Sequence, residues 1–538
     1  MKQTHLKKIR VVIALVFFCL ITALFLDANH LIPPAVGDAA LYLQFVPSLL
    51  QFITAAGLAA AGFIVVLLLT LLFGRVFCST VCPLGTLQDI IIRLSERWKK
   101  PRRVRFRYKK PHTLLRYGLL LLTVITLLYG SLLAVNLLDP FSNFGRLIAD
   151  MIRPVYIGLT NLIVSLLESF KVYLIHPMEW KIASLITLIF PLLFLGMLIW
   201  LSAGKGRLYC NTLCPVGTLL GLVSRVSLFK IKIDKEACTV CAQCSINCKA
   251  SCIRLKTKEI DFSRCIACFD CIDVCPGLGI GYKSSLTLSL NPLLTHQSPP
   301  PWRGRVRVEG KEESQGNGLP EPSKRAFLGK SVLYLAGLAQ LTKTQTATAT
   351  AVTPPNPVSP PGSRSLAQFT QTCTACHLCI SACPTQVLQP ALLQYGLAGI
   401  LQPRMDYHLS FCNFDCTRCG QVCPSGAILP LGKEVKQITQ LGVAQFLQER
   451  CIVYTDKTAC GACAEHCPTK AVRMVPYQRN LTIPEVRGAL CVGCGACEYA
   501  CPVRPQRAIY VAGHAVHRVA QRPTAEPLKV EIRQDFPF

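Results

Sequence analysis

Acidic residues and histidines are scarce in this 538-residue sequence. Asp and Glu total 29 against 57 Lys and Arg, which gives a formal charge of +28, and there are only ten His. No groove-reading motif accompanies the positive charge, so we expect no nucleic-acid partner. The few His follow no regular pattern near the cysteines, which disfavours zinc sites with mixed Cys and His ligands. The basic excess fits a membrane protein, because cytoplasmic loops of such proteins carry Lys and Arg.

Apolar residues are abundant and concentrate before residue 204. They make up 51% of the chain, and the mean hydropathy is +0.40. Since about 20 apolar residues cross a hydrocarbon core of about 30 Å, residues 1–205 are predicted to be an α-helical membrane domain with four spans. The predicted spans are Val11–Leu26, Leu49–Phe73, Tyr117–Val135 and Ala183–Ala203. A fifth stretch, Val155–Ile175, contains Glu168 and Lys171 and is predicted to lie at the outer interface; if it crossed instead, the second half would be inverted.

One phrase occurs twice, each time directly after an apolar run. Residues 74–87 read GRVFCSTVCPLGTL and residues 206–219 read GRLYCNTLCPVGTL, an offset of 132 residues. This offset predicts a duplicated two-helix unit whose motifs lie side by side. The four thiols, Cys78, Cys82, Cys210 and Cys214, are then a candidate redox or metal site, because four thiolates suit one soft metal or a further cluster. Reactive dithiols, or small residues that merely let helices pack, are the alternatives.

The remaining cysteines follow a spacing that disulfide frameworks rarely repeat. Cys238, Cys241, Cys244 and Cys248 form C-x2-C-x2-C-x3-C, and a second copy ends in Cys275-Pro. In bacterial ferredoxins three such Cys hold one 4Fe-4S cluster and the fourth binds the neighbouring cluster. The spacing predicts a two-cluster α+β ferredoxin domain over residues 206–283. One predicted ligand set is Cys238, Cys241, Cys244 and Cys275, and the other is Cys265, Cys268, Cys271 and Cys248. Cys252 is left over, and it is an alternative to Cys248.

Two further pairs of motifs follow in residues 366–505. The same crossed ligation predicts four more 4Fe-4S clusters, six in all. Their predicted ligands are Cys373, Cys376, Cys379 and Cys423; Cys412, Cys416, Cys419 and Cys383; Cys451, Cys460, Cys463 and Cys501; and Cys491, Cys494, Cys497 and Cys467. Residues 284–365 are rich in Pro, Thr and Ala and are predicted to be a linker. Residues 506–538 are predicted to be a C-terminal tail.

The repeated phrase and the first ferredoxin-type domain resemble the NapH-type membrane polyferredoxins, which belong with NosR-like and CcoG-like proteins. From Ser323 onward the chain resembles NapG, on the stretches FCNFDCTRCGQVCPSGA and CGACAEHCPTKAV. The chain thus looks like a NapH–NapG fusion. This resemblance implies delivery of electrons from quinol in the membrane to a periplasmic acceptor, such as a reductase or cytochrome. Metal handling or maturation of another redox enzyme, as in CcoG-like proteins, is the alternative function.

The sidedness of the chain is predicted from its charges and from one further segment. Residues 93–110 hold ten Lys or Arg and one Glu, which places them, and the first two clusters, in the cytoplasm of a cell with an inner membrane. NapG-type proteins begin with a twin-arginine export signal, and Ser323–Leu341 has Lys-Arg in that place. As an export-like anchor, it would put the last four clusters in the periplasm; as a plain linker helix, it would leave all six cytoplasmic.

Quinol oxidation needs a proton acceptor near the membrane interface. The candidates by position are Asp27, His30, Asp139 and Glu168.

Overall fold

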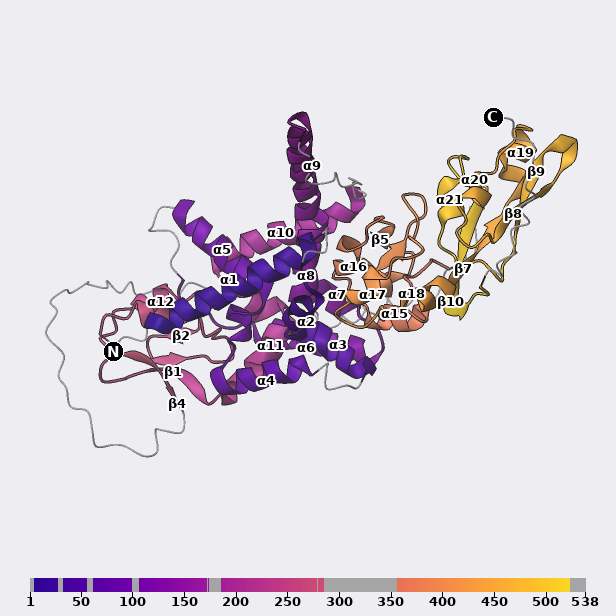
Figure 1. Ribbon diagram of the computed structural model, residues 1–538. Coiled ribbons are helices and arrows are strands. Elements are labelled where there is room, and N and C mark those ends of the chain that lie inside the picture. Colours follow the sequence, from indigo (N-terminus) through magenta and orange to yellow (C-terminus); the bar gives the residue numbers. More distant parts are fainter. Residues whose placement is uncertain are drawn as a thin grey trace, which may run out of the picture. The chain divides into compact units, whose positions relative to one another are not determined.

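A computed structural model of the chain describes residues 4–27, 32–55, 61–98, 106–171, 173, 185–277, 279–284 and 356–522. Helices dominate these residues up to about 226, and short hairpins with single-turn helices make up the rest (Figure 1). The export-like segment Ser323–Leu341 and the candidate residue His30 lie outside the described residues.

Three helical stretches are long and apolar enough to cross a membrane. They are His5–Leu26, Pro140–Ser169 and Thr187–Lys205, and the bent pair Pro34–Tyr42 and Phe45–Thr54 makes a fourth if it counts as one span. The helices up to residue 226 are α1 (Thr4–Leu26), α2 (Pro34–Tyr42), α3 (Phe45–Ala55), α4 (Gly62–Phe73), η2 (Phe77–Ser79), α5 (Pro83–Trp98), α6 (Thr113–Leu128), α7 (Leu133–Leu138), α8 (Pro140–Arg146), η3 (Leu147–Ile152), α9 (Arg153–Ser169), α10 (Leu185–Lys205), η4 (Tyr209–Leu213), α11 (Pro215–Val223) and η5 (Ser224–Val226).

Two of the predicted spans differ from the observed helices. The stretch Leu49–Phe73 is divided between α3 and α4, which pack against each other, so it is not the single predicted span. Ser48 Oγ accepts a hydrogen bond from Phe63 N at 2.9 Å at the start of α4. The stretch Tyr117–Val135 is also divided, since α6 ends at Leu128 and α7 begins at Leu133.

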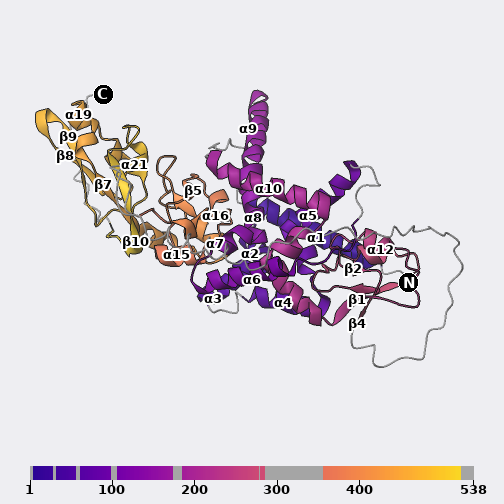
Figure 2. The ribbon, with the colours of Figure 1, turned by 180° about the vertical axis from the view of Figure 1, so that it is seen from behind.

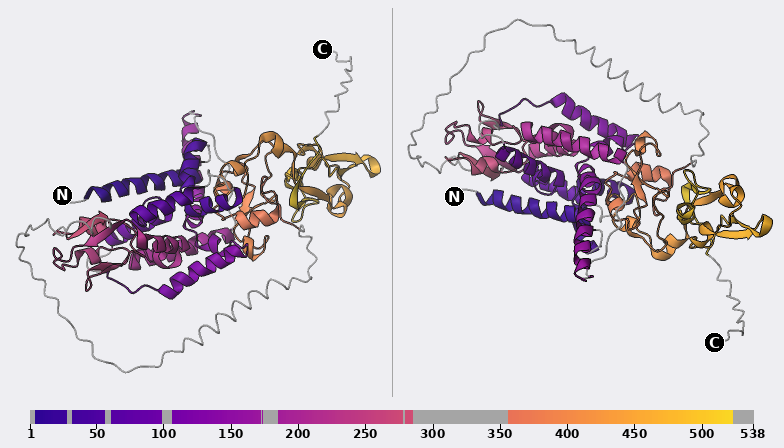
Figure 3. Two further views of the ribbon diagram at one scale, coloured as in Figure 1. Left: turned by 90° about the horizontal axis from the view of Figure 1, so that it is seen from below. Right: turned by 90° about the horizontal axis from the view of Figure 1, so that it is seen from above.

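The helices that follow the two motifs are exchanged between the halves. Helix α5, which follows the first motif, packs against α10, which precedes the second (Figure 2). Helix α11, which follows the second motif, packs against α4, which precedes the first (Figure 1). This exchange brings the two motifs together at the centre of the helical part. Figure 3 gives two further views of the helical part. Helix α9 points away from these helices (Figure 1), and its predicted place at the interface stays a prediction.

The later parts of the chain form three modules with antiparallel hairpins. The first module contains β1 (Phe229–Ile233) paired with β4 (Ile280–Ser284) and β2 (Ile253–Arg254) paired with β3 (Glu259–Ile260); the second contains β5 (Leu388–Pro390) paired with β6 (Pro403–Met405); the third contains β7 (Thr439–Phe446) paired with β10 (Ile509–Val519) and β8 (Val472–Pro476) paired with β9 (Thr482–Val486). Their short helices are α12 (Gln243–Ile246), α13 (Asp270–Asp273), α15 (Leu366–Thr372), α16 (Leu378–Ser381), η7 (Leu397–Gly399), α17 (Arg418–Gln421), α18 (Lys433–Ile438), η8 (Gln448–Arg450), α19 (Ile452–Thr455), α20 (Ala462–Glu465), η9 (Gln478–Asn480) and α21 (Ala496–Ala500). The predicted tail 506–538 thus begins with a strand of the third module, in which Val511 stands opposite Ala444.

Candidate redox centres

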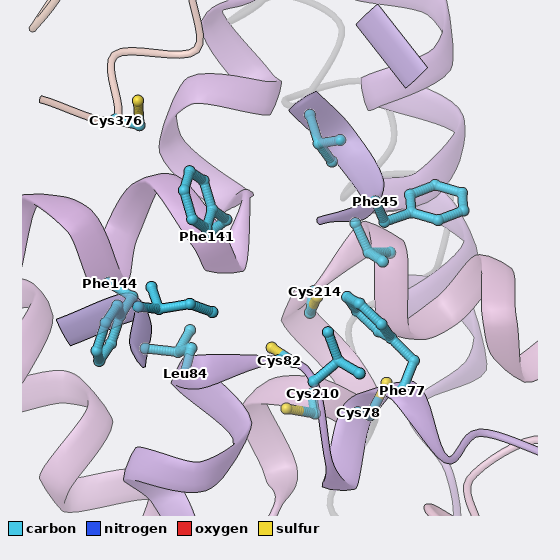
Figure 4. Close-up of a cluster of buried hydrophobic side chains, with 14 of the residues drawn as sticks. Phe45, Phe77, Cys78, Cys82, Leu84, Phe141, Phe144, Cys210, Cys214 and Cys376 are labelled. Carbon is cyan, nitrogen blue, oxygen red and sulfur yellow. The ribbon is translucent and has the colours of Figure 1, made fainter. Parts of the chain in front are cut away.

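The four motif cysteines come together in the core of the helical part. Cys78 lies on the 3-10 turn η2 and Cys210 on the π-helical turn η4, while Cys82 and Cys214 each precede the proline that begins a helix. All four are at most 4% exposed, and they lie in one region of the core (Figure 4). Cys210 lies near both Cys82 and Cys214. We call these four residues the core thiol site.

Two arginines of the repeated motif cross from one copy to the other. Arg207 Nη1 donates to the carbonyl of Cys78 at 2.8 Å, and Arg75 Nη2 donates to the carbonyl of Cys210 at 3.2 Å. Arg75 Nη2 also lies 3.7 Å from Cys78 Sγ. Both guanidinium groups are fully buried, so each motif copy places a positive charge beside the other copy's cysteine.

The glycine after each Cys-Pro makes room for the crossing arginine. A Cβ at Gly85 would lie 2.3 Å from the Cys78 carbonyl oxygen and 2.8 Å from Arg207 Nη1. A Cβ at Gly217 would lie 2.2 Å from the Cys210 carbonyl oxygen and 2.9 Å from Arg75 Nη2. Real Cβ atoms do not approach so closely, so the G-R…C-P-x-G pattern is explained by packing across the two copies.

The structure brings the other predicted ligands into six groups, each with the crossed composition that the spacing predicts. In the second module, for example, Cys379 lies beside Cys373, Cys376 and Cys423; burial raises the pKa of the Cys379 thiol, and the three neighbours raise it further. The other groups are Cys244 with Cys238, Cys241 and Cys275; Cys271 with Cys268, Cys265 and Cys248; Cys419 with Cys412, Cys383 and Cys416; Cys463 with Cys460, Cys451 and Cys501; and Cys497 with Cys494, Cys491 and Cys467. Buried thiols crowded in this way resist ionisation unless a positively charged metal group binds them.

Cys252 lies beside one of these groups. Its sulfur is 3.5 Å from Cys248 Sγ, and its thiol also forms a hydrogen bond with that of Cys265. The hydrogen bond from Cys252 lowers the pKa of Cys248 to about 7. Cys252 therefore lies within reach of the same group as Cys248.

Two of the groups line small pockets. One pocket is lined by Cys238, Cys241, Cys244 and Cys275, and another by Cys383, Cys412, Cys416 and Cys419. In the described residues, no group of three or more His, Cys, Asp or Glu side chains is arranged to hold a single metal ion. Four thiols around one pocket match the ligand set of a 4Fe-4S cluster.

The six groups and the core thiol site follow one another in a row. Within the first module Cys271 lies near Cys244, and within the second Cys379 lies near Cys419. The backbone N of Cys412 donates to the Cys494 carbonyl at 2.9 Å, which joins the second and third modules. The core thiol site shares one hydrophobic cluster with Ile266 and Cys268 of the first module and with Cys376 and Leu378 of the second.

A buried carboxylate links the helical part to the first module. Asp89 of α5 pairs with Arg207 at 2.8 Å and with Lys249 of the first module at 3.5 Å, and also with Arg10 of α1. Burial alone would raise the pKa of Asp89, but Arg207, Lys249 and Arg10 hold it well below its usual range. Lys249 also pairs with Asp270 at 3.0 Å, so the module is anchored by a connected set of charges.

A second buried pair links the helical part to the second module. His377 Nδ1 lies 2.9 Å from the Asp150 carboxylate, and His377 Nε2 donates to the Leu401 carbonyl at 2.8 Å. Cys373, Cys376 and His377 have the C-x2-C-H spacing of a haem attachment site. Because both ring nitrogens of His377 bond to the protein, neither is available to bind a haem iron.

The candidate proton acceptors differ in position. Asp139 is buried and caps α8, accepting from Ser142 N at 2.8 Å and from Ser142 Oγ at 2.7 Å. Asp27 is half-buried and accepts from Ile32 N at 3.0 Å. Glu168 is exposed near the end of α9. Asp139 also lies near the Cys376 thiol.

Sequence reasoning missed the residues that hold these parts together. Arg75 and Arg207 stand inside the repeated phrase, where the recurrence of Gly-Arg was a signal. Asp89 and Asp150 are isolated acids in apolar surroundings of a chain with few acids, which is the usual signal of a buried ion pair. The Asp150–His377 pair joins residues 227 apart in sequence, and no local pattern predicts it.

Two protein families match parts of the chain. A 4Fe-4S binding domain matches residues 55–101 and 187–235, which contain both copies of the repeated motif, and a 4Fe-4S dicluster domain matches residues 372–427 and 458–504. No solved structure matches the chain.

Several curated proteins are similar to it. Ferredoxin-type protein NapH of Haemophilus influenzae is 29% identical over 262 residues, 47% of this chain and 75% of that protein. Ferredoxin-type protein NapG of Escherichia coli is 31% identical over 192 residues, 32% of this chain and 79% of that protein. The putative electron transport protein YccM of Escherichia coli is 28% identical over 239 residues, 44% of this chain and 56% of that protein. The sequence and the row of thiol groups agree with these matches, and the chain belongs to the ferredoxin-type 4Fe-4S proteins that include NapH and NapG.

Proposed function

We propose that this iron–sulfur electron-transport protein takes electrons from quinol in the membrane and passes them through six 4Fe-4S clusters to a redox partner such as a periplasmic reductase or cytochrome. The observation that carries the proposal is the row of thiol groups, which runs from the first module through the core thiol site to the third module. Bound clusters supply one-electron carriers, which the side chains of the protein cannot supply themselves.

The proposed ligands are the 24 cysteines of the six crossed groups. The chain holds them on tight turns, and it excludes water by burying most of them. Positive groups near the thiols, among them Lys249 beside Cys268 and Lys436 beside Cys412, offset the charge of an anionic cluster. The core thiol site is proposed as a further redox or metal site, and the match of a 4Fe-4S binding domain to both motif copies supports this.

The proposed sidedness puts the first module in the cytoplasm. The backbone of Phe106, in the predicted cytoplasmic segment 93–110, donates to Ile246 of the first module at 3.1 Å. Basic segments stay on the cytoplasmic side, and the module in contact with this one would stay there too. The last four clusters are proposed to lie in the periplasm.

Reduction by a quinol analogue tests this function. In anaerobic detergent solution, quinol should reduce clusters of the wild type, and Cys78→Ser with Cys210→Ser should lose this reduction while reduction by dithionite remains. Cys19→Ser is the matched control, because Cys19 is exposed on α1 and belongs to none of the groups. Unchanged quinol reduction in the double variant would show that the core thiol site is structural. Bound copper in the wild type, without reduction by quinol, would favour metal handling instead.

A further inference from the structure

The first and second modules contact opposite ends of the same helix. Lys7, near the start of α1, pairs with Asp273 of the first module at 2.8 Å, and α1 also contacts α16 of the second module. At the other end Phe25 packs on Phe141 and lies against Gly145, which in turn touches the Cys376 carbonyl oxygen. The two contact regions are therefore separated by most of the length of α1.

This separation matches the thickness of a membrane. Lys7 and Phe25 are 18 positions apart, which is about 27 Å along an α-helix. The hydrocarbon core of a bilayer is about 30 Å thick, and α1 is one of the helices long and apolar enough to cross it. If α1 crosses, the modules at its two ends face opposite sides.

The core thiol site occupies the space between the two modules. Among the described residues, the core thiol site is the thiol group that shares a hydrophobic cluster with both Cys268 and Cys376. In Figure 4 Phe141 lies between the four sulfurs and Cys376. Arg75 joins it to the first module directly, since Arg75 Nη1 donates to the Ser263 carbonyl at 3.1 Å, two residues before Cys265.

The surroundings of the core thiol site favour a centre that gains and loses an electron. Arg75 and Arg207 are buried and hydrogen-bonded to the backbone of the opposite motif. Asp89 pairs with Arg207, but Arg10 and Lys249 pair with the same carboxylate, so the fixed charge beside the sulfurs is positive. Fixed positive groups lower the cost of adding an electron in an apolar core, where water cannot screen it. At the far end of the first module Cys241 is exposed and the adjacent Val240 is 51% exposed, which gives a soluble donor access to that end of the row.

We propose that the chain carries electrons across the membrane without quinone, from a soluble one-electron reductant on the side of the first module to an acceptor on the side of the third. The reductant loses one electron and the acceptor gains one. On this path the four thiolates of the core thiol site would hold a metal centre or cluster that passes one electron at a time, so no bond is made or broken and no proton is transferred. This activity rests on the proposed ligation of clusters, but not on the proposed oxidation of quinol.

Liposomes without quinone test this activity. Full-length protein is reconstituted in vesicles that enclose ferricyanide, dithionite is added outside, and bleaching of the enclosed ferricyanide is followed; neither ion crosses a bilayer readily. Wild type and Cys19→Ser should bleach it well above the rate of protein-free vesicles. Cys78→Ser with Cys210→Ser should fall to the protein-free rate, with the iron content of the six groups retained.

The outcomes separate this inference from the proposed function. Wild-type vesicles that bleach no faster than protein-free ones, although the protein holds its iron and is reduced by quinol, would overturn the inference alone. A double variant that bleaches as fast as wild type would also overturn it, because the core thiol site would then not be part of the path. Protein that lacks iron would instead contradict the proposed ligation.

Discussion

At the scale of single residues, Arg75 and Arg207 explain why the repeated motif contains Gly and Arg as well as two cysteines. Each arginine needs a close approach to the other copy's cysteine carbonyl, and each approach needs a glycine. The cysteines are thereby held by contacts between the copies as well as within each copy. The sequence showed that the thiols recur, and only the packing shows why Gly, Arg and Gly recur with them.

Arg75→Lys should destabilise the helical part although the charge is kept. A lysine ammonium cannot reach Asn211, the Cys210 carbonyl and the Ser263 carbonyl at once, as the guanidinium does. Leaving buried acceptors unpaired costs about 1–3 kcal/mol each. Thermal unfolding in detergent, followed by loss of cluster absorbance, should show a lower midpoint for this variant. The matched control is Arg93→Lys, at an exposed arginine of α5, which should leave the midpoint unchanged.

At the scale of elements, the sequence predicted which segments form apolar helices better than where each helix begins and ends. The runs at Val11–Leu26 and Ala183–Ala203 fall within α1 and, from Leu185, α10, because both are apolar over their length. The run Leu49–Phe73 is as apolar, yet it is divided between α3 and α4, since periodicity does not reveal where a helix folds back. The six thiol groups were predictable because each takes three cysteines from one local motif and the fourth from the neighbouring motif, as in bacterial ferredoxins. The contacts of the modules with α1, α5 and α8 were not, because no motif links those distant residues.

Gly145→Ala should disturb the contact between α8 and the second module. A Cβ at this position would lie 2.3 Å from the Cys376 carbonyl oxygen and 2.6 Å from the Phe25 ring. Overpacking of this kind costs about 1–3 kcal/mol, so the thermal midpoint should fall. Gly118→Ala is the control: nothing lies within 4 Å of its added Cβ, and Ala in a helix is favoured over Gly by up to about 1 kcal/mol. Equal midpoints for the two variants would contradict the close contact of α8 with Cys376.

At the scale of the whole molecule, the three modules and the core thiol site lie one after another and are joined by direct contacts. The first module is anchored by Asp89 and Lys249 on one side of the core thiol site, and the second by Asp150 and His377 on the other. The third follows through the Cys412–Cys494 backbone contact. Such an order gives the core thiol site a central place in the proposed path of electrons.

The proposed sidedness predicts where a reporter becomes active. An enzyme that is active only in the periplasm, fused after Phe538, should be active in cells that express the full chain. The same reporter fused after Ser284, at the end of the first module, should be inactive, because that module is proposed to be cytoplasmic. Equal activity of the two fusions would place both ends of the row on one side.

The measurement that tests the central claim most directly is the metal content of anaerobically purified protein. Six clusters of four irons predict about 24 iron atoms and as many acid-labile sulfides per chain. Cys423→Ser should lose about four of each, because Cys423 is the fourth proposed ligand of the cluster on Cys373, Cys376 and Cys379. About eight iron atoms with zinc in the remaining sites would contradict the account, since most of the thiol groups would then not be iron–sulfur centres.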